Sequence, residues 1–366
     1  MGLLEFIAYR IRDRPFDLEF AITYRCNLRC IQCDVWRYDQ ENPHKAREEL
    51  EIEEIQRIFS SYDGLRVIGI TGGEPFLRGD LDLIVKTISK SQKHLEQLFI
   101  TTNGQSPEIA REKVKAILEM RERSGRKFSP HILVSIDGPP EIHDHIRGVV
   151  GAYGKALSTL KVLSGLRDRF DFLLGTVTVL SPFNIDRFDE VLEEARSIKA
   201  EYGTETSFCI WFTGQLYKNE RMGREIRVED FRESLKRRVE DIKALVRGDG
   251  SMVSKGRSIF YDLLKLWLED PRRQVIPCGG ASARYFLDPY GNLYPCTIYG
   301  ARIGNLRDNS YDLNRLLDSE ERRRVREAVK AQRCPICCNT CETIPAMMAY
   351  PERAAIKWLS SKVFRK

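Results

Sequence analysis

The segment LEFAITYRCNLRCIQC, residues 18–33, places three cysteines directly behind an apolar run of the β type. Residues 18–23 are rich in β-branched and aromatic side chains and have the length of a strand. The same order, a short apolar run followed by a polar or glycine-rich turn, returns at TGGEP (71–75), TTNG (101–104) and SIDG (135–138). The segment therefore predicts the first of several strand–turn–helix units.

Apolar runs and amphipathic stretches alternate six times. Strands are expected at residues 18–23, 67–71, 98–102, 132–136, 173–179 and 207–212. Helices are expected at residues 52–62, 81–91, 107–123, 152–167 and 185–201. This alternation predicts an α/β fold with a parallel sheet and crossover helices. Six units are fewer than the eight of a closed TIM barrel, so we expect a partial (β/α)6 TIM-like barrel, with its chemistry at the carboxyl ends of the strands.

The alternation stops after residue 212, which predicts a smaller second part. It contains two helical stretches (228–246 and 256–268), the hairpin-like segment ARYFLDPYGNLYPCTI (283–298) and a charged helix (312–332). We expect an interdomain boundary near 213–227 and a small C-terminal α+β domain. The resulting division is an N-terminal helix (1–15), the barrel (16–212), a linker with bridging helices (213–270), the α+β domain (271–345) and a C-terminal tail (346–366).

Composition excludes several classes of protein. The 366 residues are 42% hydrophobic and 31% charged, enough for a large core. A net charge of +6 is modest for this length and does not indicate nucleic acid as a partner. The sequence has neither a signal peptide nor an apolar stretch of ~18 residues, so we expect a cytoplasmic protein. The short basic amphipathic segments at 3–12 and 354–366 are expected to dock onto the barrel in preference to a lipid surface.

The ten cysteines are grouped, which in a reducing compartment favours metal ligation over disulfides. Cys26, Cys30 and Cys33 form a C-x3-C-x2-C pattern with no fourth cysteine or histidine nearby. Three thiolates suit a [4Fe–4S] cluster with one open iron. The alternatives are a zinc site completed from elsewhere in the chain and plain buried cysteines. Cys209 stands alone on the sixth strand and is expected to lie in the core.

CNLRCIQC and TGGEP, each behind a strand, resemble the radical S-adenosylmethionine (radical SAM) superfamily over about residues 16–212. The resemblance implies a [4Fe–4S] cluster at the barrel mouth, with the amine and carboxylate of SAM on the open iron. Reduction of the bound SAM then yields methionine and a 5′-deoxyadenosyl radical, so the cofactor supplies the difficult chemistry.

The resemblance also implies a set of SAM contacts. Gly72, Gly73 and Glu74 match the motif that contacts the SAM amino group. Asn103 and Ser135 end two strands, where polar side chains face the ribose or carboxylate, and Thr176 is a further candidate. Gln32 stands where an aromatic residue is common, and its backbone can still contact adenine.

Other polar residues at the barrel mouth receive no catalytic assignment. We interpret residues 135–148, with His143 and His145, as a polar loop. Arg147 either pairs with the SAM carboxylate or braces this loop. The sequence identifies no catalytic acid or base.

The second cysteine group has the spacing C-x12-G-x4-C followed by C-x2-C, which resembles SPASM and twitch domains that bind auxiliary iron–sulfur clusters. Two fully cysteine-ligated clusters need more than the six thiols of residues 278–341. We therefore expect one auxiliary [4Fe–4S] cluster on Cys278, Cys296, Cys334 and Cys337, with Cys341 as the rival to either of the last two. A structural zinc site is the alternative.

The resulting hypothesis is a radical SAM enzyme that takes hydrogen from a peptide, a small molecule or a lipid, assisted by one auxiliary cluster. An external donor such as flavodoxin or ferredoxin would supply electrons. The alternative from another class is an iron–sulfur electron-transfer or regulatory protein without SAM chemistry.

Overall fold

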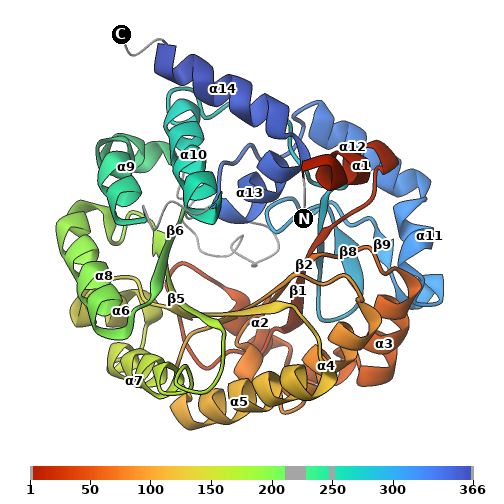
Figure 1. Cartoon of the computed structure of the whole chain (residues 1–366), viewed down its shortest axis with the longest axis horizontal. Coiled ribbons are helices and arrows are strands. Elements are labelled where there is room, and N and C mark those ends of the chain that lie inside the picture. The colour runs from red at the N-terminus through yellow and green to blue at the C-terminus, as the bar shows by residue number, and fades with distance from the viewer. Residues whose placement is uncertain (1–2, 211–227, 247–251, 364–366) are drawn as a thin grey trace.

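A single curved sheet organises the chain, for which a computed structural model describes residues 3–210, 228–246 and 252–363. Its nine strands follow the order β6-β5-β4-β3-β2-β1-β7-β8-β9 (Figure 1). The strands are β1 (Asp17–Thr23), β2 (Val67–Gly72), β3 (Gln97–Thr102), β4 (Ser129–Ser135), β5 (Leu173–Leu180), β6 (Glu205–Ile210), β7 (Arg284–Leu287), β8 (Asn292–Tyr294) and β9 (Gly304–Asn305).

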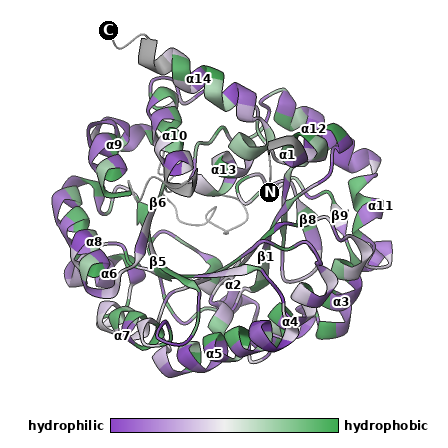
Figure 2. Ribbon diagram, viewed as in Figure 1, coloured by the Kyte–Doolittle hydropathy of each residue, from purple (hydrophilic) through white to green (hydrophobic). Residues whose placement is uncertain are grey.

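Helices surround the sheet and follow most of its strands. They are α1 (Leu3–Arg12), α2 (Val35–Glu41), α3 (Ile52–Ser61), α4 (Leu81–Ser91), α5 (Pro107–Ser124), α6 (Pro140–Arg147), α7 (Ala152–Ser164), α8 (Phe188–Tyr202), α9 (Arg232–Val246), α10 (Met252–Trp267), α11 (Leu313–Leu317), α12 (Glu320–Lys330), α13 (Thr340–Ala349) and α14 (Pro351–Val363). Figure 2 shows hydrophilic and hydrophobic residues mixed along these helices, as expected for amphipathic elements. Within the described part of the chain, no helix combines the length and hydropathy needed to span a bilayer.

The prediction of a partial parallel barrel is confirmed. Strands β1 to β6 pair in parallel with their sequence neighbours, and each lies within three residues of its predicted position. The expected boundary at 213–227 lies outside the described residues. The segment predicted as a C-terminal tail includes the end of α13 and all of α14. Helix α14 packs against α10, and α1 packs against α13.

The two faces of the sheet have different surroundings. Leu18, Phe20 and Ile22 of β1 belong to a large hydrophobic cluster that includes residues of α3, α4 and α5. Side chains alternate along a strand, so Glu19 and Thr23 point to the opposite, concave face. We call these the helix-covered face and the concave face. The distinction decides which predicted residues can meet at the barrel mouth.

The C-terminal part extends the same sheet. All four residues of β7 are buried, and β7 pairs in parallel with β1, with Asp17 beside Arg284. An unclosed barrel leaves the β1 edge with unpaired backbone groups, and β7 satisfies them. The antiparallel strands β8 and β9 continue the sheet outward. The sequence predicted the hairpin but not its attachment to the barrel.

Two local predictions were wrong. The segment interpreted as a polar loop contains α6, which begins at Pro140 and ends before Gly148 at φ +66°. Proline suits the first helical turn and glycine the left-handed position after the last. The charged helix predicted at 312–332 is divided into α11 and α12, because Ser319 caps a new helix by accepting a hydrogen bond from the Arg322 N–H.

Candidate metal and cofactor sites

The loop after β1 carries Cys26, Cys30 and Cys33, each partly buried. Helix α6 holds this loop in place, because the N–H groups of Arg29 and Ile31 donate to carbonyls of the last α6 turn at 3.1 and 2.9 Å. A Cβ on Gly148 would lie 2.3 Å from the Arg29 carbonyl oxygen, so glycine permits this close approach. Helix α6 is thus a structural support of the cysteine loop, a role that the sequence did not reveal.

A buried cation lies beside the three thiols. Arg147 Nη1 is 3.9 Å from Cys30 Sγ, and its Nη2 pairs with Asp137 Oδ2 at 2.8 Å. Burial raises the pKa of Cys26 to about 12 and also raises the pKa values of Cys30 and Cys33. The Cys30 thiolate adds to the effect in both Cys26 and Cys33. Burial alone would lower the pKa of Arg147, but Asp137 and Cys30 raise it above its usual value. The thiols therefore need a positively charged partner to ionise together.

The turn after β2 brings the predicted glycine motif against this loop. Gly73 N–H donates to the Thr23 carbonyl at 2.8 Å, and Glu74 N–H donates to the Arg25 carbonyl at 2.8 Å. A Cβ on Gly73 would lie 2.2 Å from the Arg25 oxygen. Only glycine allows the two turns to lie this close, which places the motif next to the cysteines.

Glu74 connects this turn to β3. Its carboxylate accepts hydrogen bonds from the Asn103 N–H at 2.6 Å, Thr102 Oγ1 at 2.8 Å and the Phe76 N–H at 3.1 Å. Burial raises the pKa of Glu74 to about 7, against the opposing effect of these hydrogen bonds. Asn103 Nδ2 lies 3.9 Å from Cys26 Sγ. Glu74 and Asn103 are therefore neighbours at the cluster loop.

The remaining predicted SAM contacts are Gln32, Ser135 and Thr176, and they do not all lie in the same part of the site. Gln32 is buried within the cysteine loop, and Ser135 is buried at the end of β4. Ser135 pairs in register with Val177. Both residues alternate along their strands with residues of the helix-covered face, so Ser135 points to the concave face. Thr176 shares its face with Leu174, a member of the core under the helices. The structure thus keeps Thr176 apart from the other predicted contacts.

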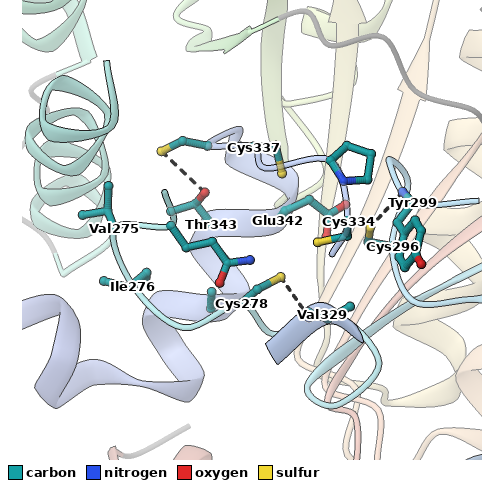
Figure 3. Close-up of a pocket in the computed structure, with 15 residues that line it drawn as sticks. Val275, Ile276, Cys278, Cys296, Tyr299, Val329, Cys334, Cys337, Glu342 and Thr343 are labelled. Carbon is teal, nitrogen blue, oxygen red and sulfur yellow. Dashed lines mark hydrogen bonds between the residues drawn. The ribbon is translucent and has the colours of Figure 1, made fainter. Parts of the chain in front are cut away.

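A second group of thiols lines a cavity between α12, α13 and the β8 region. The cavity and the open solvent at its mouth together contain about 580 Å³ of space free of protein atoms. Cys278, Cys296, Cys334 and Cys337 line it, and Figure 3 shows their sulfur atoms directed toward a shared space. Backbone N–H groups of Gly280 and Tyr299 donate to the sulfurs of Cys278 and Cys296 at 3.3 and 3.2 Å. The four first-choice ligands therefore share one site. Cys338 also borders it, and the Thr343 hydroxyl lies 3.7 Å from its sulfur.

A buried charge network reaches this cavity from the barrel. Glu342 lines the cavity, accepts from the Thr297 hydroxyl at 2.7 Å and pairs with Arg284 Nε at 3.3 Å. Arg284 also pairs with Asp17 and with Glu19, the latter at 3.0 Å. Burial raises the pKa of Asp17 to about 7, although Arg284 opposes this shift. Sequence reasoning missed this network, because its members are scattered along the chain.

Cys341, the predicted rival ligand, lies elsewhere. It is exposed, is not among the residues that line the cavity, and forms a hydrogen bond with Cys209. Cys209 is only partly buried, and its sulfur lies 2.9 Å from Thr340 Oγ1. The interpretation of Cys209 as an isolated core residue therefore does not describe its surroundings.

The donor sets fit iron–sulfur clusters in their chemistry. Three thiols beside a cation, and four partly or fully buried thiols around a cavity, are suitable soft ligands. Burial raises the pKa values of all four cavity thiols, that of Cys278 to about 11, so a bound cation would be required to ionise them. Within residues 3–210, 228–246 and 252–363, no three His, Cys, Asp or Glu side chains are already arranged around a metal position. Four thiols also suit zinc.

Comparison with protein families identifies both parts. Residues 20–195 match the radical SAM superfamily, and residues 278–342 match the SPASM family, described as an iron-sulfur cluster-binding domain. The chain belongs to the radical SAM superfamily and carries a C-terminal SPASM domain. The two matches support a [4Fe–4S] cluster and SAM as cofactors of the barrel, and auxiliary iron–sulfur binding in the SPASM domain.

Curated relatives match either about half of the chain or most of it. A probable GTP 3′,8-cyclase of Thermococcus kodakarensis is 31% identical over 49% of this chain and 60% of its own length. The subtilosin biosynthesis protein AlbA of Bacillus subtilis is 23% identical over 81% of this chain and 59% of its own. The mycofactocin maturase MftC of Mycolicibacterium smegmatis is 24% identical over 89% and 76%, respectively. The matched region thus spans about 60% of the length of the first two.

Solved structures support the architecture. The crystal structure of SuiB from Streptococcus suis is similar with a TM-score of 0.55 and 15% identity, covering 92% of this chain and 76% of SuiB. The SAM-bound form of SuiB gives the same TM-score with 16% identity, covering 88% and 72%. At this identity, the similarity establishes the fold alone.

Proposed function

We propose that this enzyme cleaves SAM reductively and uses the resulting radical to take a hydrogen atom from a peptide or protein, assisted by one auxiliary [4Fe–4S] cluster. The observation that carries the proposal is the convergence of Cys26, Cys30 and Cys33 with Gly73, Glu74 and Asn103 at one end of the sheet. When bound, the cluster and SAM supply the 5′-deoxyadenosyl radical. The protein's own residues hold the loop, compensate its charge through Arg147 and position the ligand-binding turn.

Anaerobic incubation with SAM and dithionite tests the first part. The reconstituted protein should release 5′-deoxyadenosine, and Cys30→Ala should abolish release, because two thiolates under-ligate the cluster. Cys341→Ala is the matched control, because Cys341 lies outside the loop after β1 and does not line the auxiliary cavity. Absence of 5′-deoxyadenosine with intact clusters would instead favour an electron-transfer or regulatory protein.

The single auxiliary cluster rests on the cavity lined by Cys278, Cys296, Cys334 and Cys337. Two [4Fe–4S] clusters predict about eight iron atoms per chain. Cys337→Ala should reduce this to about four, whereas Cys341→Ala should leave it unchanged. Iron and sulfide analysis with electron paramagnetic resonance measures the outcome. Stoichiometric zinc with about four iron atoms would establish the alternative structural zinc site.

A peptide substrate is favoured by the extent of the relatives' similarity. AlbA and MftC, a bacteriocin biosynthesis protein and a maturase, align over 81% and 89% of the chain, whereas the cyclase aligns over 49%. A small molecule is the second candidate because the cyclase has the higher identity, 31%. A peptide encoded beside the gene should stimulate 5′-deoxyadenosine formation more than GTP does; the reverse would favour the small molecule.

A further inference from the structure

Cys209 and Cys341 meet at the edge of the barrel although they lie far apart in sequence. Cys209 belongs to β6 and Cys341 to the first turn of α13, and these two elements pack together. The Cys341 thiol forms a hydrogen bond with Cys209, whose sulfur is also 2.9 Å from the Thr340 hydroxyl. The fold therefore places two thiols in direct contact.

This pair lies outside both cysteine groups assigned above. The first group occupies the loop after β1, and the auxiliary cavity is lined by neither Cys209 nor Cys341. Cys341 is exposed, and Cys209 is partly buried. Both therefore retain thiol chemistry that the proposed clusters do not require.

The pair faces the concave side of the sheet. Cys209 alternates along β6 with Phe208 and Ile210, which pack in the core against α8 and α9. Charged groups from other elements surround it: Glu19 of β1 and Asp137 after β4 act on Cys209, and Glu19 and Arg284 act on Cys341. Of these groups only Arg284 favours a thiolate, so accessibility is what distinguishes the pair from inert core cysteines.

We propose that Cys209 and Cys341 are a redox-active thiol pair, which forms a reversible disulfide between β6 and α13 by exchange with a small-molecule disulfide. The exposed Cys341 thiolate attacks one sulfur of the disulfide RSSR, which forms a mixed disulfide and releases RS⁻. Cys209 then attacks the Cys341 sulfur and releases the second RS⁻. The two thiol protons pass to the two released thiolates, so one protein disulfide and two RSH are formed.

The contact geometry assigns the two roles. Accessibility makes Cys341 the residue that meets the external disulfide, and the contact with Cys209 makes the second step intramolecular. The bond would tie β6 to the first turn of α13. That turn carries Glu342, which lines the auxiliary cavity and pairs with Arg284. The redox state of the pair thus controls whether a covalent link joins the barrel edge to the auxiliary site.

Oxidised glutathione, added anaerobically to the protein with its clusters in place, tests the proposal. Non-reducing peptide mapping should reveal a Cys209–Cys341 cross-link, while iron and sulfide contents stay unchanged. Cys209→Ser should accumulate a glutathione adduct on Cys341, and Cys341→Ser should react at Cys209 at least tenfold more slowly. Cys338→Ala, the matched control, should form the same cross-link as the wild type.

Three results would overturn the proposal. Glutathione on both cysteines without a cross-link would show that the thiols do not pair. Loss of iron in Cys341→Ser would make Cys341 a cluster ligand. Zinc bound stoichiometrically to the pair, with resistance to oxidation, would make it a metal site. The wild-type cross-link is independent of the variants and of SAM cleavage, so failure here is distinguishable from failure of the proposed function.

Discussion

Arg147 is a buried cation beside the cysteine loop. Its partner Asp137 is fully buried, and Arg147 itself is 9% exposed. The pair is useful because it places a cation beside Cys30 without opening the loop to water. Buried pairs are sensitive to the loss of one member, since the other then stays buried without compensation.

Arg147→Met should therefore destabilise the protein by about 3–5 kcal/mol and reduce the iron bound by the loop. Thermal unfolding and iron analysis measure the two effects. The matched control is Arg187→Met, which removes an exposed pair with Glu141 of the same helix α6. Arg187→Met should lower the free energy of unfolding by less than about 1 kcal/mol. Equal losses in the two variants would contradict the role of the buried pair.

His131 gives the protein a predictable dependence on acid. Burial lowers the pKa of His131 to about 4, and Arg257 adds to the effect. In the unfolded chain the histidine binds its proton near pH 6.5. The contribution of neutral, buried His131 to the free energy of unfolding is therefore complete above about pH 6.5 and is lost as the pH falls toward 4. At pH 5 the loss amounts to about 2 kcal/mol, or about 4 °C in Tm.

His131→Gln should accordingly show a smaller decrease in Tm between pH 7.5 and pH 5 than the wild type. Differential scanning calorimetry measures this difference. The exposed His94→Gln is the control and should follow the wild-type profile. An unchanged pH dependence in His131→Gln would show that this histidine does not carry the linkage.

At the scale of elements, the turn after β2 depends on its closeness to the turn after β1. Gly73→Ala should force the two turns apart, because its Cβ would meet the Arg25 carbonyl oxygen at 2.2 Å. Overpacking of this kind costs about 1–3 kcal/mol, so SAM affinity should fall about tenfold or more. Anaerobic calorimetric titration with SAM measures it. Gly79→Ala, whose Cβ has no atom within 4 Å, should bind SAM normally.

Elements with a strong local pattern were predictable from the sequence. The six barrel strands and helices such as Leu81–Ser91 follow apolar periodicity, which local residues determine. Helix α6 was missed although Pro140, Gly148 and the buried pair Ile142 and Ile146 carry its signals. Five polar residues within α6 obscured that pattern and favoured the interpretation as a loop.

Site residues were predictable from the sequence where they belong to a local motif. They were uncertain where the pairing register of the strands determines which face of the sheet a side chain occupies. Cys26 and Gly73 lie in motifs whose spacing is local. The face occupied by Thr176 depends on pairing with Val134, which the residues of β5 alone do not determine. The contact between Cys209 and Cys341 depends on the docking of α13 against β6. Long-range packing of this kind leaves no local signal.

At the scale of the molecule, one sheet connects the SAM-binding end to the auxiliary domain. Strand β7 is hydrogen-bonded along β1, and Arg284 joins Asp17 and Glu19 to Glu342 at the cavity. Structural change at the auxiliary site therefore has a direct route to the strand that precedes the cysteine loop. The sequence indicated two domains but contained no signal that their strands are continuous.

This continuity predicts that loss of the auxiliary cluster weakens β1 as well as β7. In Cys337→Ala, backbone amides of Asp17–Thr23 and Arg284–Leu287 should exchange hydrogen faster together, because opening of β7 exposes its hydrogen bonds to β1. Strand β4, which is separated from β7 by β3, β2 and β1, should keep its protection. Hydrogen–deuterium exchange with mass spectrometry measures all three strands, with Cys338→Ala as the control. Faster exchange confined to β7 would mean that the auxiliary domain and the barrel open independently. Faster exchange of β1 and β7 together would make the shared sheet the route by which the auxiliary site stabilises the cysteine loop.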